Sequence, residues 1–378
     1  MELKPWLEEP FAKTEAKLAI TCERIGNKIP YIPTNGSYTD QGDNNISSWT
    51  NGFWGGIMWQ LYNVTQKDIY RKSAENLEKR LDEAFHNYVG LHHDVGFMYL
   101  YTAVANYILT GNEQSLKRGL HAANLMAGRY NPESKFIIAW NVESKGWMII
   151  DTMMNLPLLY WADKELGRPH YTFVANTHAD SAIEKLVRPD GSCHHIAVLD
   201  HHTGEVLKLP GGQGYETGSS WSRGQAWALY GYALCHQWTN QTRFLDTAKK
   251  IAHYFIANIA KTDYIPLSDF RAPKEPVLVD TTAASIALCG LLSIAEQVPQ
   301  LEKDLYHDTA VSIIKSLVEN HSEFNPDIDG VIINGTTAYH ENKENHTGHK
   351  HHVPVIYGDY FFIEGLLRLM GKHFMVSV

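Results

Sequence analysis

Two aspartates, Asp94 and Asp151, stand where the sequence predicts the start of an apolar helix. Asp94 precedes Val95-Gly96-Phe97, and Asp151 follows Ile149-Ile150. One aspartate in such a place is most often a helix N-cap, which contributes about 1 kcal/mol. A carboxyl group among apolar residues can also hold a proton near neutral pH, because burial raises its pKa. Two carboxyl groups at neighbouring helix starts are what acid–base chemistry on a glycoside requires.

A third segment, Gly218 to Trp227, carries Trp221, Arg223 and Trp227 at another predicted helix start. A guanidinium binds a carboxylate through two hydrogen bonds, and indole rings offer flat apolar faces to sugars. The tryptophans alone could equally be core residues, but an arginine embedded among them needs an anion. Trp49 begins a further aromatic and glycine-rich segment that we place at the same rim.

Histidines gather late in the chain, with His346, His349, His351 and His352 around Lys350. Such a cluster could bind a metal, but its spacing matches neither the H-E-x-x-H motif nor a facial triad. We therefore interpret Glu341 to His352 as a solvated or substrate-facing loop and expect no metal and no cofactor.

The elements that position these residues follow from hydrophobic periodicity. Six apolar helical stretches, each opened by a turn containing Gly, Asp or Trp, are expected at Trp49 to Tyr62, Asp94 to Leu109, Asp151 to Leu166, Trp221 to Trp238, Asp280 to Val298 and Asp359 to Met370. Six amphipathic helices accompany them, at Phe11 to Ile25, Asp68 to Tyr88, Glu113 to Met126, Tyr171 to Leu186, Arg243 to Ile259 and Leu301 to Val318.

A helix that is apolar on all sides must be enclosed, whereas a helix with a charged face can lie outside. The pattern therefore predicts an all-α fold, an (α/α)6 barrel with an inner and an outer ring. Ser192 to Leu209 is expected to insert a small β-hairpin. Because no linker interrupts the alternation, residues 1–378 are predicted to form a single domain.

The bulk composition excludes several classes of partner. A net charge of −9 offers no general basic surface for nucleic acid. No run of about 18 apolar residues predicts a membrane span, and the acidic first residues do not form a secretory signal. Four widely spaced cysteines suggest neither a zinc site nor a disulfide framework. We expect a cytoplasmic protein, as a monomer or a weak homodimer.

Several motifs together resemble the unsaturated glucuronyl hydrolases, glycoside hydrolase family 88. They are Trp49-Thr-Asn-Gly-Phe-Trp, His93-Asp-Val-Gly-Phe, Ile150-Asp151 with Asn155-Leu-Pro-Leu-Leu, Ser220-Trp-Ser-Arg-Gly-Gln-Ala-Trp and Gly358-Asp-Tyr-Phe-Phe. The likeness runs from about Trp49 to Leu369 in the same order. It implies an (α/α)6 barrel and a glycosidase that acts after polysaccharide lyases. Such enzymes release the terminal 4,5-unsaturated glucuronic acid of glycosaminoglycan oligosaccharides by hydrating its C4=C5 double bond.

The resemblance implies unequal roles for the two aspartates. Asp151 becomes the acid that protonates C4, after which water adds at C5 and the resulting hemiketal opens. Asp94 grips the sugar hydroxyls and, by its charge, helps to keep Asp151 protonated. The residues expected to bind substrate are Trp49, His93, His195, Gln213, Trp221, Arg223, Trp227, His340 and Lys350.

Two alternatives stay open. An unsaturated rhamnogalacturonyl hydrolase would share the barrel and the chemistry but act on pectin fragments, although the paired aspartates with Ser220 to Trp227 favour the glucuronyl branch. A non-catalytic carbohydrate-binding barrel would bind the sugar without consuming its double bond. We further hypothesise that His346, His349 and Lys350 form a cationic patch for a sulfate on the second sugar.

Overall fold

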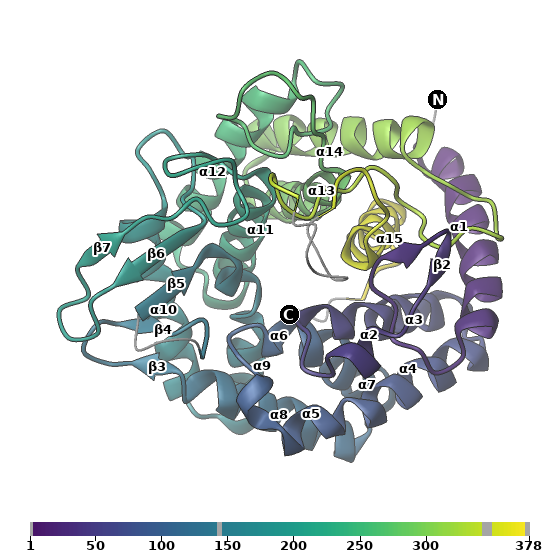
Figure 1. Ribbon diagram of the computed structural model, residues 1–378, viewed down its shortest axis with the longest axis horizontal. Coiled ribbons are helices and arrows are strands. Elements are labelled where there is room, and N and C mark those ends of the chain that lie inside the picture. The colour runs from purple at the N-terminus through teal and green to yellow at the C-terminus, as the bar shows by residue number, and fades with distance from the viewer. Residues whose placement is uncertain (1–2, 142–145, 342–349, 375–378) are drawn as a thin grey trace.

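The computed structural model of the protein describes residues 3–141, 146–341 and 350–374. Viewed along the axis of the fold, two layers of helices surround a common centre (Figure 1). In the described part of the chain, an (α/α)6 barrel is formed, as the alternation of apolar and amphipathic stretches predicts. Among the described residues, no helix combines the length and the apolar character needed to cross a membrane.

The inner layer contains the apolar stretches. It consists of α3 (Phe53–Thr65), α6 (Val95–Tyr99) with α7 (Ala105–Thr110), α9 (Pro157–Leu166), α11 (Ser222–Thr239), α13 (Thr281–Gln297) and α15 (Ile356–Met370). Neighbours in this layer pack on one another, including α11 on α13, α13 on α15 and α15 on α3. Every residue of α13 from Thr281 to Ala295 is buried. Because no side of this helix meets solvent, its sequence carries no charged face.

The outer layer consists of α1 (Leu3–Ile25), α4 (Asp68–Arg80), α8 (Glu113–Ala127), α10 (His170–Leu186), α12 (Thr242–Ile259) and α14 (Gln300–Asn320), with the short α2 (Gln41–Asn44) and α5 (Asp82–His86) beside it. Each long outer helix covers an inner one, for example α4 on α3 and α14 on α13. Only one face of α4 is buried, through Tyr70, Ala74, Leu77 and Glu78, so its remaining charges stay in solvent.

The starts of three inner segments differ from the prediction. Asp151 does not begin an α-helix but lies in a 3-10 turn, Ile150–Met154, because Pro157 at the first position of α9 starts the regular helix there. The second segment is interrupted by a π-helical turn, Leu100–Val104. The last begins at Ile356, three residues before Asp359. Asp151 is therefore not an α-helix N-cap, the alternative that the sequence left open beside a catalytic role.

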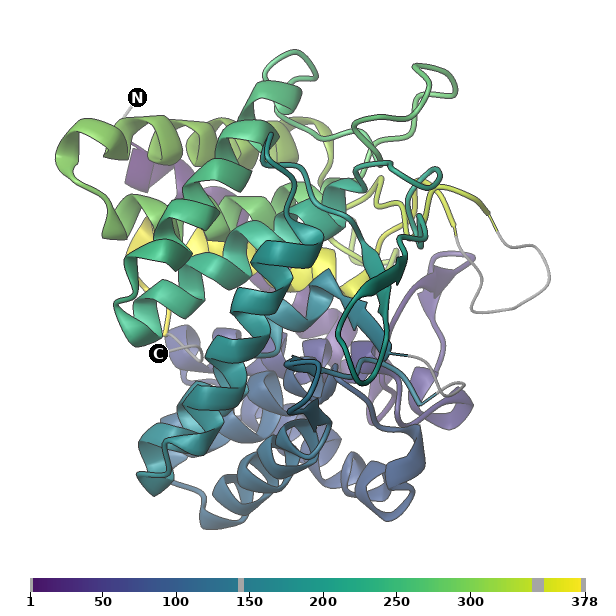
Figure 2. The ribbon, with the colours of Figure 1, turned by 90° about the vertical axis from the view of Figure 1, so that its left-hand side faces the viewer.

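The predicted hairpin is present as β6 (Ile196–Leu199) and β7 (Val206–Lys208). A strand that the sequence analysis missed, β5 (Gly146–Ile149), pairs antiparallel with β6, giving the order β5-β6-β7. Two smaller hairpins are formed by β1 (Pro33–Thr34) with β2 (Ser37–Tyr38) and by β3 (Tyr130–Asn131) with β4 (Phe136–Ile137). Strands and long loops gather at one end of the barrel (Figure 2). Because Asp151 comes directly after β5, the sheet helps to fix its position.

The four cysteines, Cys22, Cys193, Cys235 and Cys289, are free and buried, as expected. They make no disulfide and belong to the apolar packing of the barrel.

Candidate active site

Asp151 is a partly exposed carboxyl group, with 14% of its side chain accessible, whose Oδ1 is buried and unsatisfied. This Oδ1 has no hydrogen-bond partner, and Nε2 of His195 lies 3.6 Å from it. Burial raises the pKa of Asp151 to about 7, although the positive charge of Arg223 opposes the shift. The carboxyl group can therefore hold a proton near neutral pH, as a general acid must.

His195 is held as a neutral imidazole that presents N–H to Asp151. Its Nδ1 accepts a hydrogen bond of 2.9 Å from the backbone N–H of Gln213, so the single proton of the ring must be on Nε2. Burial, aided by the charge of Arg223, lowers the pKa of His195 to about 3. A Cβ at Gly212, where φ is +61°, would lie 2.0 Å from Nδ1. The loop before Gln213 thus fits closely against the ring.

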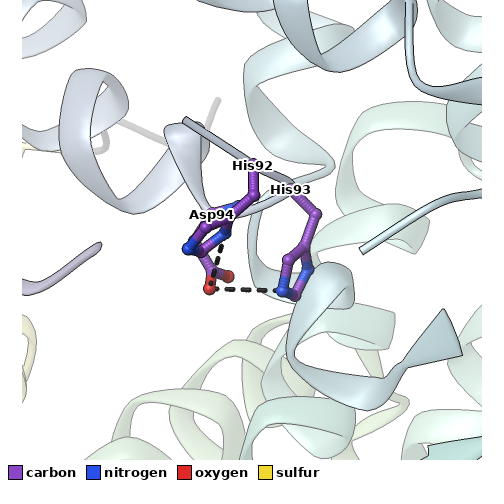
Figure 3. Close-up of side chains that lie close together, drawn as sticks. All are labelled: His92, His93 and Asp94. Carbon is purple, nitrogen blue, oxygen red and sulfur yellow. Dashed lines mark hydrogen bonds and ion pairs between the residues drawn. The ribbon is translucent and has the colours of Figure 1, made fainter. Parts of the chain in front are cut away.

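Asp94 has a donor close to each of its oxygens, Asn155 and His93, in contrast to Asp151. Its Oδ1 accepts a hydrogen bond of 2.9 Å from Nδ2 of Asn155. Its Oδ2 lies 3.2 Å from Nε2 of His93 and 3.5 Å from Nδ1 of His92 (Figure 3). Burial and the charge of Asp151 raise the pKa of Asp94 well above its ordinary value, while the bond from Asn155 opposes this. The charge of each carboxyl group therefore affects the pKa of the other, and the pair favours the state in which it binds one proton in total.

The segments carrying the two aspartates are tied together. Nδ1 of His93 and Oγ1 of Thr152, next to Asp151, are 2.7 Å apart. Burial keeps the pKa of His93 well below its ordinary value, so this ring is neutral. The pairing places the predicted residues Asp94, His93 and Asp151 in one buried cluster.

A possible metal site overlaps this cluster. The nearest ligand atoms of His92, His93 and Asp94 lie within 4.8 Å of one another. Arg129 nevertheless acts on all three: its charge lowers the pKa of both imidazoles and of Asp94. A neighbouring guanidinium opposes a divalent cation as it opposes a proton. We therefore interpret the cluster as a hydrogen-bonded acid–imidazole group.

A cavity of about 760 Å³ opens beside His195, the imidazole that faces Asp151. His195 and Gln213 line it, and these residues connect the cavity to the carboxyl group through the contacts described above. Its other lining residues are mostly aromatic or amide, among them Tyr31, Asn44, Asn45, Trp49, Trp140, Trp147, Thr337 and Tyr357. Flat rings with a few polar groups are typical of a carbohydrate site, since a pyranose has both apolar faces and hydroxyl edges.

Known proteins share this sequence and this fold. The sequence model of Glycosyl Hydrolase Family 88 matches residues 22–262. Unsaturated glucuronyl hydrolase of Bacillus sp. (strain GL1) is 34% identical over 364 residues, which is 93% of this chain and 93% of that protein. The chain belongs to glycosyl hydrolase family 88. It is a glycosidase of the unsaturated glucuronyl hydrolase type.

Other members of family 88 agree with this result. Unsaturated chondroitin disaccharide hydrolase of Streptococcus agalactiae is 31% identical over 96% of this chain and 91% of its own length. The crystal structure of the Bacillus sp. GL1 enzyme, described as responsible for the degradation of glycosaminoglycan, superimposes with a TM-score of 0.89 and covers 96% of both chains. A structure of an unsaturated glucuronyl hydrolase specific for heparin has a TM-score of 0.87 at 27% identity, covering 97% of this chain and 98% of that one. The predicted family and barrel are confirmed.

Arg223 already has a protein anion in this family 88 chain. The side chain is 1% exposed and its Nη1 lies 3.0 Å from Asp280 Oδ2. Nη1 also donates to the carbonyl of Thr336 at 2.7 Å, and Nη2 donates to that of Thr337. The anion required by the sequence argument is therefore Asp280, and a direct contact with the substrate carboxylate stays a prediction.

The predicted aromatic residues divide between cavity and core. Trp49 lines the cavity and stacks on Tyr357, with ring centroids 5.1 Å apart. Trp221 is almost wholly buried, with its ring centroid 4.3 Å from that of His195. Trp227 is fully buried and packs on Phe97 at 5.0 Å. A sugar contact for Trp221 and Trp227 stays a prediction.

Of the three remaining predicted residues, Gln213 and Lys350 bond to Thr337, and His340 bonds to Tyr215. Nε2 of Gln213 donates to the carbonyl of Thr337 at 2.6 Å. The backbone N–H of Thr337 donates to the carbonyl of Lys350 at 2.9 Å, and the backbone N–H of Lys350 donates to Oγ1 of Thr337 at 2.7 Å. His340 Nε2 pairs with the carbonyl of Tyr215 at 2.7 Å. Lys350 is thus placed beside the cavity, whereas His346 and His349 lie outside the described residues.

Sequence reasoning missed several members of the site. Trp140 and Trp147 form an aromatic pair on the cavity wall, with centroids 5.4 Å apart. Their signal was two tryptophans beside a short apolar run, which reads as core until β5 is known. Asn155 was part of a quoted motif but received no role, because its contact with Asp94 spans 61 residues.

Proposed function

We propose that the protein removes terminal 4,5-unsaturated glucuronic acid from lyase-generated glycosaminoglycan oligosaccharides. The observation that carries this proposal is the Asp151 carboxyl group, whose pKa of about 7 and buried, unpartnered Oδ1 suit a proton donor beside a sugar-sized cavity. Relatives support the substrate class: a Streptococcus agalactiae enzyme variant in this family has been crystallised with dGlcA-GalNAc6S. The same chemistry is proposed here for unsaturated uronic-acid di- and oligosaccharides.

The proposed reaction begins with proton transfer from Asp151 to C4 of the unsaturated sugar. The electron pair of the C4=C5 bond forms the new C4–H bond, which leaves oxocarbenium character at C5. The Asp151 carboxylate then takes a proton from water as the water oxygen bonds to C5, which restores the acid. The C5 hemiketal opens by breaking its bond to the ring oxygen, giving a 5-keto group. The hemiacetal left at C1 collapses to an aldehyde and frees the remaining sugar.

His195 and Asp94 support the two charge states of Asp151 in this scheme. The Nε2–H of His195 faces Asp151 and can stabilise the carboxylate formed after proton transfer. Asp94 places a second carboxyl group near the first. The charge of Asp151 raises the pKa of Asp94, and by the same repulsion an ionised Asp94 disfavours loss of the proton from Asp151 before substrate arrives. Hydrogen bonding of Asp94 to sugar hydroxyls is proposed as its second role.

The test is the disappearance of the ultraviolet absorbance of the C4=C5 double bond with unsaturated chondroitin, heparin and rhamnogalacturonan disaccharides. We expect the glycosaminoglycan disaccharides to be consumed. Consumption of the rhamnogalacturonan substrate alone would favour the pectin alternative, and binding without any loss of absorbance would favour a carbohydrate-binding barrel.

Sulfated substrates are proposed because Lys350 lies next to Thr337 on the cavity wall. An ammonium group there can pair with a sulfate on the second sugar. Equal turnover of sulfated and unsulfated disaccharides would contradict this. The single domain, the cytoplasmic location and the monomeric or weakly dimeric state stay predictions.

A further inference from the structure

Asn155 lies between the two catalytic segments and is completely buried. Its Nδ2 donates 2.9 Å to Oδ1 of Asp94 and is 3.2 Å from the backbone carbonyl of Asp151. One amide group therefore contacts the carboxyl group of one aspartate and the main chain of the other. The predicted site residues do not include it.

The orientation of this amide is fixed by its other end. Oδ1 of Asn155 accepts a hydrogen bond of 2.8 Å from the backbone N–H of Phe97, so the NH2 group must face Asp94. Gly96 packs directly on the side chain: a Cβ there would lie 2.5 Å from Oδ1 and 2.7 Å from Cα of Asn155. The donor cannot turn away from Asp94 without rebuilding this contact.

A hydrogen bond from an amide N–H favours the ionised form of a carboxyl group. Asp94 receives such a bond on Oδ1, while Oδ1 of Asp151 has no partner. Two buried carboxyl groups close together disfavour double ionisation, so the pair keeps one proton and the donors decide where it resides. The bond from Asn155 therefore opposes the burial that raises the pKa of Asp94, and favours Asp94 as the carboxylate and Asp151 as the acid.

We propose that Asn155 is a positioning residue that keeps the shared proton on Asp151 by holding Asp94 as the carboxylate. The inference rests on the proposed function, in which Asp151 must carry the proton to C4. Asn155 does not touch the substrate in this scheme, because it is completely buried and both of its side-chain polar atoms are bonded within the protein. Its removal should therefore lower kcat more than it raises KM.

The experiment measures kcat and kcat/KM against pH for the whole protein with Asn155→Ala and Asn155→Asp, using an unsaturated chondroitin disaccharide. Without the donor, Asp94 takes up a proton at higher pH, so the acidic limb of the kcat profile should move up by about one pH unit. The maximal kcat should fall by about 10- to 100-fold, the usual effect of losing a hydrogen bond to a charged group. Asn155→Asp keeps the volume but adds a third carboxyl group, and should cost more than Asn155→Ala.

A matched control is Asn106→Ala. Asn106 is also buried, and its Nδ2 donates 2.7 Å to Glu78 Oε2, outside the site. This variant loses the same kind of bond and should lower the melting temperature without moving the acidic limb. An equal shift in Asn106→Ala, or an unshifted limb in both Asn155 variants, would overturn the inference.

Gly96→Ala approaches the same contact from the other side and remains informative if Asn155→Ala does not fold. The added Cβ should displace the amide and shift the acidic limb in the same direction. The same assay with Asp151→Asn separates the two hypotheses. Near-normal turnover in Asp151→Asn contradicts the proposed function itself, whereas an inactive Asp151→Asn with unshifted Asn155 and Gly96 variants contradicts only the role of Asn155.

Discussion

Asp94 and Asp151 precede neighbouring inner segments of the barrel, yet their surroundings differ. Asp94 has an amide donor on one oxygen and Nε2 of His93 near the other. Asp151 has a single imidazole at 3.6 Å and an oxygen with no partner. Donors around a carboxyl group favour its charged form, and burial without donors favours its protonated form. The same residue type therefore receives opposite tasks from its environment.

The largest expected effect comes from Asp151→Asn. The amide has nearly the same shape but cannot give a proton to C4, so turnover should fall by about 10²- to 10⁴-fold while substrate still binds. Loss of double-bond absorbance gives the rate, and calorimetric titration with the disaccharide gives the affinity. Near-native activity of Asp151→Asn would show that Asp151 is not the proton donor, and the two aspartates would then not differ in role as proposed.

Asp94→Asn should reduce kcat by about 10- to 100-fold, a smaller loss, because the variant removes a charge and not the proton donor. Without the neighbouring negative charge, Asp151 should lose its proton at lower pH. The basic limb of the kcat profile, which lies near the pKa of about 7 in the native protein, should therefore move down. An unmoved basic limb would show that the two carboxyl groups do not share their titration.

The barrel was predictable from sequence, but most of the asymmetry between the aspartates was not. Apolar residues on all sides of Thr281 to Ala295 could be read directly as an enclosed helix. The partners of the site residues come from distant positions in the sequence. Arg223 pairs with Asp280, 57 residues away, and α9 and α10 lie between β5 and its partner strand β6. Short apolar runs such as Gly146–Ile149 do not distinguish strand from core helix by periodicity. These long-range contacts form only when the helices close into the barrel, so the local sequence pattern does not predict them.

Gly212→Ala tests the imidazole that serves Asp151. The new Cβ would clash with Nδ1 of His195 and break the bond from Gln213, so the Nε2–H would no longer be directed at Asp151. We expect kcat to fall by about 10-fold, since small misplacements of a catalytic group are costly. Gly111→Ala is the control, because its φ is +71° and no atom lies within 4 Å of the added Cβ. Equal losses in both variants would attribute the effect to backbone strain.

The stability difference between Asp151→Asn and the native protein should depend on pH, because the same titration of Asp151 that affects kcat also affects folding. The pKa of Asp151 is raised on folding from 3.8 to about 7, so its contribution to stability is complete below about pH 4 and is lost as the pH rises through 7. Asparagine does not titrate. The melting temperature of Asp151→Asn relative to the native protein should therefore increase between pH 5 and pH 8, by a few degrees. A constant difference would indicate that Asp151 is already ionised in the folded protein.

The smallest expected effect is that of a chelator. His92, His93 and Asp94 are close enough to hold a metal, but we assign Nε2 of His93 to Asp94 Oδ2, while Nδ1 of His92 accepts the backbone N–H of Asp94. The nearby Arg129 also opposes a cation. Dialysis against EDTA should then leave kcat and the melting temperature unchanged. A loss of activity that Zn²⁺ restores would make Asp94 a metal ligand. In that case its difference from Asp151 would arise from coordination and not from the donors around it.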